Sequence, residues 1–166
     1  MATSVVEQTV ERSVVHSTFV IERNFSRSPE QIFTMFSEET KKQQWFAEDP
    51  NKIVDLYISE FHTGGSERID YHYVEGSPFT GIPFVNDGHY QEILPDKRIV
   101  NASTMNIGGR CISAALSTFE FMPAENGTRL VFTFRGAFFD GSDGPVIREM
   151  GWNKLMDQLT AALECA

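Results

Sequence analysis

The sequence predicts an α+β fold in which a curved, seven-stranded antiparallel sheet surrounds one long C-terminal helix. Residues 144–164 carry the longest helical pattern in the chain, with Trp152, Met156 and Leu159 on one apolar stripe. Most of the chain between residues 50 and 136 shows strand periodicity broken by turn signals. A single long helix and a run of strands bury their apolar faces only against each other, so we expect the sheet to wrap around the helix and to leave room for a pocket between them.

Length and charge limit the classes of function. The chain has 166 residues, and 14 basic against 23 acidic side chains give a net charge of −9. This length predicts one domain, over residues 14–166, after an N-terminal tail at residues 1–13. Nucleic acids and anionic membranes bind through clustered lysine and arginine, so we expect neither as a partner.

Cysteine usage and the N-terminus predict a cytoplasmic protein. Cys111 and Cys165 are isolated thiols without the spacing of a metal or disulfide motif. The first residues lack a basic stretch followed by an apolar run, and no segment is long and apolar enough to span a membrane. We therefore expect no signal peptide and no transmembrane helix.

The first elements are a strand and two short helices. Residues 14–25 alternate in character, with Phe19 and Ile21 on one face, which predicts a strand. Ser28 precedes Pro29 and lies three residues before Gln31, which is the pattern of a capping box at a helix start. Residue Ser37 is expected to cap a second short helix that ends at residues 45–46.

A meander of six strands follows the two helices. The turns between them carry glycine, proline or asparagine, and Asn126-Gly127 is the strongest hairpin signal. The longest connection, residues 75–83, contains two glycines and two prolines and is expected to form a rim of the fold. The expected strands are Ile53–Glu60, Ser66–Val74, Phe84–Leu94, Arg98–Asn106, Ile112–Met122 and Thr128–Gly136.

Alternation along these strands predicts one aromatic face and one charged face. Leu130, Phe132 and Phe134 alternate with Arg129, Val131, Thr133 and Arg135, as expected for an antiparallel sheet that is wetted on one side. We expect Phe132 and Phe134 to face Trp152 and Leu159 of the C-terminal helix.

The C-terminal helix contains one unusual residue. Pro145 suits its first turn, whereas Gly151 costs about 1 kcal/mol relative to alanine inside a helix. We expect close approach to the sheet, or a kink that opens a space, to offset this cost.

The order of these elements resembles the helix-grip fold of the START-like (SRPBCC) superfamily. Within it, the sequence resembles the family related to the activator of heat-shock protein 90 ATPase, which is also linked to polyketide cyclases. The resemblance extends from about residue 14 to residue 164 and rests on the segments Phe19-Val20-Ile21-Glu22-Arg23, Ser28-Pro29-Glu30-Gln31-Ile32-Phe33, Trp45-Phe46, Gly64-Gly65, Gly88-His89-Tyr90-Gln91-Glu92-Ile93 with Pro95, Thr128-Arg129-Leu130, and Gly151-Trp152 with Leu155 and Leu159.

The resemblance implies a fold, but the shared motifs carry little information about a ligand or a reaction. Many relatives have a polar residue such as histidine where this chain has Phe134. The eukaryotic activator also has a separate N-terminal domain that contributes to chaperone binding, and about thirteen residues take its place here.

Aromatic side chains are the main candidates for a ligand pocket, and a filled aromatic core is the alternative for each of them. Arg148 lies one turn before Trp152 on the apolar side of the helix, where a guanidinium is able to bind a carboxylate. The alternatives are that Arg148 extends to solvent or forms an ion pair with Asp140 or Asp143 in the preceding loop. The candidate lining residues are Trp45, Tyr71, Tyr73, Tyr90, Phe132, Phe134, Arg148, Trp152 and Met156.

Other polar residues give weaker signals. Arg23 falls on the inward face of the first strand, where a pair with Glu67 or Glu92 is expected. The four histidines are dispersed, and even if His72 and His89 become cross-strand neighbours they lack the further ligands of a metal site. No motif predicts a cofactor or a catalytic triad.

These observations favour a cytoplasmic protein that binds a small hydrophobic or amphipathic molecule, with no metal and no cofactor. One alternative is a cyclase- or dehydratase-like enzyme that uses Arg148, Tyr71, Tyr73, Glu92 or His89 as acid–base groups. Another is a co-chaperone-like interaction module, which requires an exposed patch instead of a cavity. A homodimer and a chaperone partner are left open.

Overall fold

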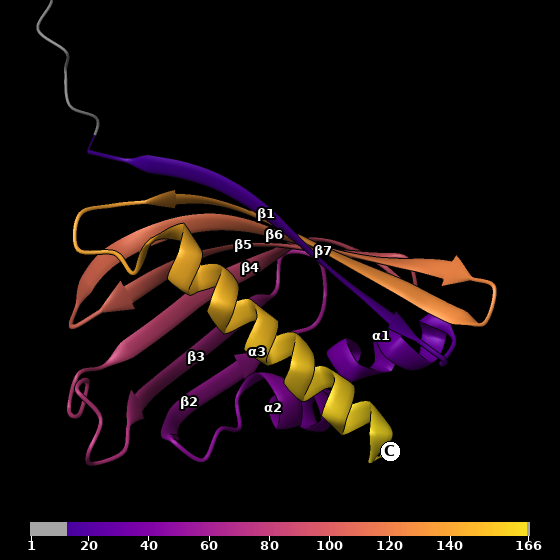
Figure 1. Ribbon diagram of the computed structural model, residues 1–166, viewed down its shortest axis with the longest axis horizontal. Coiled ribbons are helices and arrows are strands. Elements are labelled where there is room, and N and C mark those ends of the chain that lie inside the picture. The colour runs from indigo at the N-terminus through magenta and orange to yellow at the C-terminus, as the bar shows by residue number, and fades with distance from the viewer. Residues whose placement is uncertain (1–12, 166) are drawn as a thin grey trace, which may run out of the picture.

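A computed structural model describes residues 13–165, and its main feature is one seven-stranded sheet (Figure 1). The strand order is β1-β7-β6-β5-β4-β3-β2, and all neighbouring strands run antiparallel. The predicted fold class and meander are therefore confirmed. The strands are β1 (Val15–Phe25), β2 (Lys52–Ser59), β3 (Ser66–Tyr73), β4 (Phe84–Leu94), β5 (Arg98–Ile107), β6 (Arg110–Ala124) and β7 (Gly127–Phe138).

Two short helices, α1 (Pro29–Ser37) and α2 (Glu39–Phe46), connect β1 to β2. The capping box of α1 is present, because the Gln31 amide donates to Ser28 Oγ at 3.3 Å and the Ser28 amide donates to Gln31 Oε1 at 3.0 Å. The expected cap of α2 by Ser37 is wrong: Glu38 occupies the cap position and makes no capping bond through its side chain.

The long helix α3 (Gly144–Glu164) lies across the concave side of the sheet (Figure 1). It packs mainly against α2, β1 and β7. The Trp152 ring lies 4.3 Å from the Phe132 ring between centroids, and Leu159 is fully buried. The predicted interface of β7 with α3 is therefore confirmed for this pair.

The core consists of two groups of buried side chains. The larger group joins α1, α3 and the inner faces of β1, β6 and β7, and includes Phe36, Phe119 and Phe132. The smaller group, which we call the second cluster, consists of Ala47, Ile69, Tyr71 and Phe84. It lies on β3 and β4 beside α2, away from the strands that carry most of the α3 contacts.

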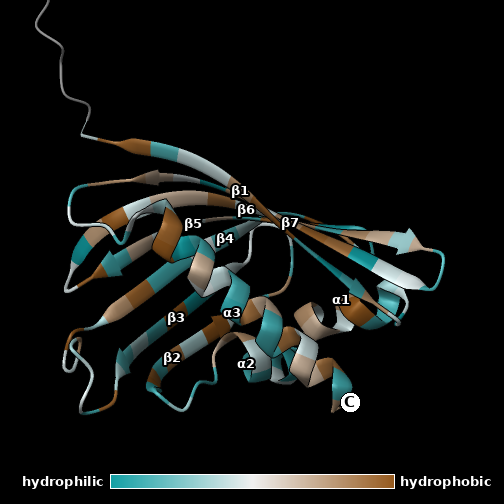
Figure 2. Ribbon diagram, viewed as in Figure 1, coloured by the Kyte–Doolittle hydropathy of each residue, from teal (hydrophilic) through white to brown (hydrophobic). Residues whose placement is uncertain are grey.

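The N-terminal end of α3 exposes apolar side chains to solvent. Val146, Ile147 and Met150 are 70%, 56% and 63% exposed, and Figure 2 shows hydrophobic colour at this end of the helix. Gly151 is also exposed, and a Cβ atom added there would meet nothing within 4 Å. The expected close approach of Gly151 to the sheet is therefore wrong, and α3 is unbroken from residue 144 to residue 164.

Within residues 13–165, no helix combines the length and the apolar character needed to cross a membrane.

Candidate functional site

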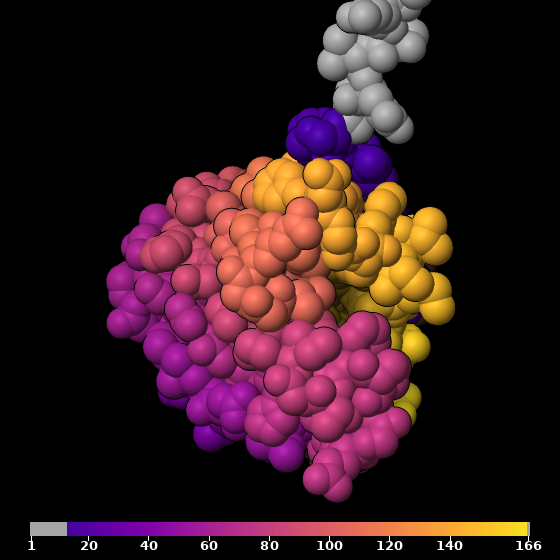
Figure 3. Space-filling view, turned by 90° about the vertical axis from the view of Figure 1, so that its left-hand side faces the viewer, coloured from indigo at the N-terminus to yellow at the C-terminus, as the bar shows by residue number. Residues whose placement is uncertain are grey.

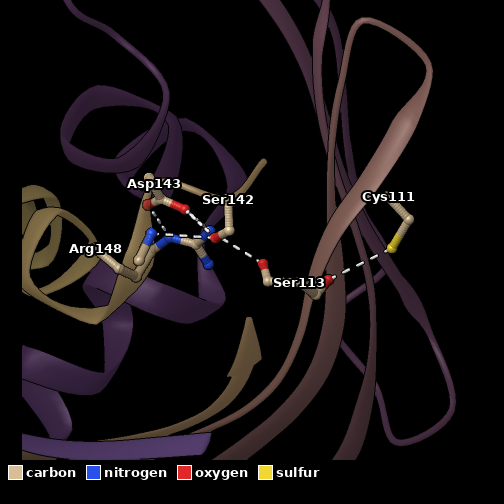
Figure 4. Close-up of polar contacts among 6 residues, drawn as sticks. Cys111, Ser113, Ser142, Asp143 and Arg148 are labelled. Carbon is tan, nitrogen blue, oxygen red and sulfur yellow. Dashed lines mark hydrogen bonds and ion pairs between the residues drawn. The ribbon is translucent and has the colours of Figure 1, made fainter. Parts of the chain in front are cut away.

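Arg148 holds the loop between β7 and α3 to β6 (Figure 4). Its Nε donates to Asp143 Oδ2 at 2.9 Å, and its Nη2 donates to Asp143 Oδ1 at 2.8 Å and to Ser113 Oγ at 3.0 Å. The guanidinium carbon lies 5.3 Å from the Phe138 ring centroid and 5.8 Å from that of Phe134. Of the alternatives for Arg148, the ion pair with Asp143 is thus formed, and the guanidinium is largely buried instead of extending to solvent.

Local sequence explains this arrangement. Ser142 Oγ donates to Asp143 Oδ1 at 2.9 Å and accepts from the Gly144 amide at 3.1 Å, which fixes the carboxylate in front of α3. A Cβ atom at position 136 would lie only 2.6 Å from the Phe134 ring, so glycine there leaves room for the aromatic rings beside Arg148. Nη1 of Arg148 makes no hydrogen bond to any residue between 13 and 165.

Lys52 lies close to two of the predicted pocket tyrosines. Its Nζ is 4.8 Å from the Tyr71 ring centroid and 5.9 Å from that of Tyr73. Burial lowers the pKa of the Lys52 ammonium, and the nearby Asp49 carboxylate opposes this shift. Within the described part of the chain, no carboxylate lies within ion-pair distance of Lys52 and its ammonium makes no hydrogen bond. Burial also raises the pKa of the Tyr71 hydroxyl well above its usual range.

These residues come from elements that meet at one end of the sheet. Figure 3 shows this end hollowed between the turn that joins β5 to β6, the start of α3 and the connection at residues 75–83. That connection borders a cavity of about 470 Å³, which is lined by Asn51, Tyr73 and residues 74–79 and not by Lys52, Tyr71 or Arg148. The expectation that residues 75–83 form a rim agrees with this position.

Five other predicted pocket residues belong to the larger core group. Trp45, Tyr90, Phe132, Phe134 and Met156 are at most 2% exposed. The Trp45 indole donates to the Met35 carbonyl at 2.8 Å. The structure thus brings Tyr71 and Tyr73 to one end with Arg148 and Lys52, whereas these five side chains are packed inside the larger core group.

Sequence reasoning missed a buried polar network around Glu67. Its Oε1 accepts from Lys42 Nζ at 2.9 Å and from the Tyr90 hydroxyl at 2.7 Å, and its Oε2 accepts from Asn101 Nδ2 at 3.2 Å. The Lys42 side chain is only 4% exposed and lies within about 5 Å of the Phe36, Trp45 and Phe46 rings.

Tyr57 places a further buried hydroxyl near this network. The Tyr57 hydroxyl oxygen is buried and has no hydrogen-bond partner in the described part of the chain. Burial raises the pKa of Tyr57, and the Glu67 carboxylate raises it further. One sequence signal pointed to this region: Gly88 inside a strand marks a place where another group approaches closely.

The remaining polar candidates do not converge on one site. His72 bonds Asp55 at 2.8 Å, whereas His89 lies opposite Ser66 at the other end of β3, so the two histidines are not cross-strand neighbours. Glu92 pairs with Arg98. Over residues 13–165, no cluster of three or more histidine, cysteine or acidic side chains is arranged to hold a metal ion.

The expected partner of Arg23 is also wrong. Its Nη2 donates to Asp157 at 3.1 Å and to Asn153 at 3.1 Å, both on α3, instead of pairing with Glu67 or Glu92. The inward arginine of β1 thus ties the edge of the sheet to the helix.

Comparison with known proteins agrees with this architecture. The chain is 36% identical to the Mll3558 protein from Rhizobium loti, with a TM-score of 0.79 over 91% of this chain and 99% of that one. It is 34% identical to a putative uncharacterized protein from Rhizobium leguminosarum, with a TM-score of 0.84 over 93% and 98% of the two chains. No curated protein sequence matches the chain.

More distant structures share the fold. The AHSA1 protein from Silicibacter pomeroyi is 21% identical, with a TM-score of 0.71 over 90% of this chain and 99% of that one. The family model described as activator of Hsp90 ATPase homolog 1-like protein matches residues 26–164, which span α1 to the end of α3. The chain therefore belongs to the family of activator of Hsp90 ATPase homolog 1-like proteins.

Proposed function

We propose that this protein binds a small amphipathic molecule with an acidic group, at the end of the sheet where Tyr71, Lys52 and Arg148 gather. The observation that carries the proposal is the Lys52 ammonium, which lies over the Tyr71 ring without an anionic partner among residues 13–165. A partly buried ammonium with unused donors is a favourable site for a carboxylate.

The apolar part of such a ligand has a matching surface. Tyr71, Tyr73 and Phe84 form ring contacts of 5.2–5.9 Å, and Ile82 and Met105 are only partly buried beside them. Because α3 packs mainly on α2, β1 and β7, it leaves this part of the concave face less covered. Binding sites of this kind combine an apolar wall with a few polar groups that fix orientation.

Arg148 offers a second cation at the same end. Asp143 and Ser113 occupy its Nε and Nη2, so only Nη1 remains for a ligand. Lys52 is therefore the main anchor in this proposal, and Arg148 supports it.

The test compares an acid with its neutral analogue. Native mass spectrometry of freshly purified protein identifies any molecule that is retained. Octanoate and octanamide are then titrated by calorimetry, and we expect octanoate to bind about tenfold more tightly because its carboxylate meets Lys52. Lys52→Met should remove this preference while retaining the apolar contribution. Lys97→Met, in the exposed turn between β4 and β5, is the control and should change nothing.

Equal affinities of octanoate and octanamide for the parent protein would refute the proposal. Arg148→Met is a poorer test because it leaves the Asp143 carboxylate without its partner and so also lowers stability. For the same reason, loss of binding in that variant alone does not support the anchor.

A co-chaperone-like interaction module is the second candidate, and the exposed apolar strip of Val146, Ile147 and Met150 favours it. Sedimentation velocity at several concentrations tests whether the strip joins two copies, and Met150→Glu should abolish any dimer that forms.

The location that we propose is the cytoplasm, which suits the free thiols of Cys111 and Cys165.

A further inference from the structure

The outer face of the sheet carries a cavity of about 580 Å³ that the proposed function does not use. It lies over the N-terminal half of β1, the C-terminal half of β7 and the first half of β6. Phe134 and Phe138 of β7 are buried on the inner face, so Arg135 and Ala137 between them point to the outer face. This cavity and the Tyr71 end of the protein are thus separated by the sheet.

Strand register explains why the surface is hollow here. His16 on β1 and Ala114 on β6 both lie opposite Ala137, which forms a row with small side chains at its centre. In the next row, Thr18 and Leu116 both lie opposite Arg135. Side chains in such rows are about 4.5–5.5 Å apart at Cβ. The two alanines leave a depression between the imidazole of His16 and the side chains of Arg135 and Leu116.

The charge of this cavity is unusual for the chain. The protein has a net charge of −9, yet no aspartate or glutamate lines the cavity. Most cations in residues 13–165 are ion-paired, including Arg129, which shares the outer face of β7 and bonds Glu22 at 2.7 Å. Arg135 makes no ion pair and no hydrogen bond in the same part of the chain. Its guanidinium therefore keeps all its donors for a ligand.

We propose that this cavity is a second binding site, specific for a small, flat organic acid such as an aromatic carboxylate. The carboxylate bonds the Arg135 guanidinium in the bidentate geometry that arginine favours, with the Thr18 hydroxyl as a further donor. The ring lies on Ala114 and Ala137 and against Leu116, which is 40% exposed in the free protein. The binding surface is thus a cation beside a shallow apolar floor.

The test locates binding by nuclear magnetic resonance. Benzoate should shift the backbone amide signals of Thr18, Leu116 and Ala137, and benzamide should not. Arg135→Gln should weaken benzoate binding about tenfold, since it removes a charge-assisted contact. Ala137→Leu should abolish binding by filling the floor, while its outward position keeps the fold intact. Arg129→Gln is the matched control and should leave benzoate affinity unchanged.

Three other outcomes would contradict either the site at Arg135 or its preference for an organic acid. Benzoate binding that is unchanged in Arg135→Gln would refute the site. Shifts confined to Tyr71 and Lys52 would also refute it while supporting the proposed function, and Lys52→Met separates the two sites. If inorganic phosphate produces the same shifts as benzoate with equal affinity, and Ala137→Leu still binds it, the cavity is a simple anion site and the organic class is wrong.

Discussion

The buried contact between Lys42 and Glu67 makes a strong prediction about stability. Glu67→Gln keeps one acceptor oxygen, which serves either Tyr90 or Asn101 because these donate to different oxygens of Glu67, and it removes the only carboxylate that contacts the Lys42 ammonium within the described residues. Because the Lys42 side chain is 4% exposed, the change leaves an uncompensated charge in the core. Removing one partner of such a pair costs about 3–5 kcal/mol. We expect the free energy of unfolding to fall by this amount.

A double-mutant cycle measured by urea denaturation tests this reasoning. Lys42→Met should cost only about 1–2 kcal/mol, because Glu67 is 13% exposed and keeps two hydrogen-bond donors. The double variant Lys42→Met/Glu67→Gln should then cost at least about 1 kcal/mol less than the sum of the single changes. Additive losses, or a loss below about 1 kcal/mol for Glu67→Gln, would refute the conclusion that the pair is coupled.

Three further predictions follow from the tyrosines and from α3. Burial raises the pKa of the Tyr71 hydroxyl, so the unfolded chain loses this proton at a lower pH than the folded protein does. The free energy of unfolding should therefore fall as the pH rises above about 10. Tyr71→Phe should reduce that fall in urea midpoints measured between pH 8 and 11. Gly151→Ala should raise the free energy of unfolding by roughly 0.5–1 kcal/mol, since the new methyl group meets nothing, and a loss of stability would contradict the open surface. Trp152→Ala should lower it by about 3 kcal/mol in chemical denaturation, because the indole contacts Phe132 and Phe119, and a loss below about 1 kcal/mol would contradict this packing.

Periodicity was sufficient to predict the fold because it reports which face of each element is buried. Alternation placed Phe132 and Phe134 on the inner face of β7, and helical spacing placed Trp152 opposite them. Turn signals such as Asn126-Gly127 then fixed the order of the meander. These signals are local, and a single antiparallel sheet with one long helix has few other ways to bury the apolar faces of its elements.

The polar contacts were less predictable because they depend on register and on side-chain reach. Arg148 had two carboxylates within reach in sequence, and only the turn geometry selects Asp143. Lys42 belongs to a helix whose sequence is mostly polar, so nothing in its pattern indicates burial among aromatic rings. Aromatic residue type does not distinguish a side chain near Lys52, such as Tyr71, from one in the larger core group, such as Phe132.

The pairing of β4 with β5 brings Gly88 close to the Asn101 side chain. A substitution at Gly88 therefore tests how the Glu67 network is assembled. A Cβ atom at position 88 would lie 2.6 Å from Asn101 Oδ1, so the missing side chain gives Asn101 its place beside Glu67. Gly88→Ala should therefore displace the Asn101 amide and cost about 1–3 kcal/mol, because a buried carboxylate oxygen loses its donor. In an Asn101→Ala background the new methyl group gains room, so Gly88→Ala should cost less than half as much there. Equal costs in both backgrounds, measured by urea denaturation, would place the clash at the backbone of β5 instead of at the Asn101 side chain and would contradict this role for Gly88.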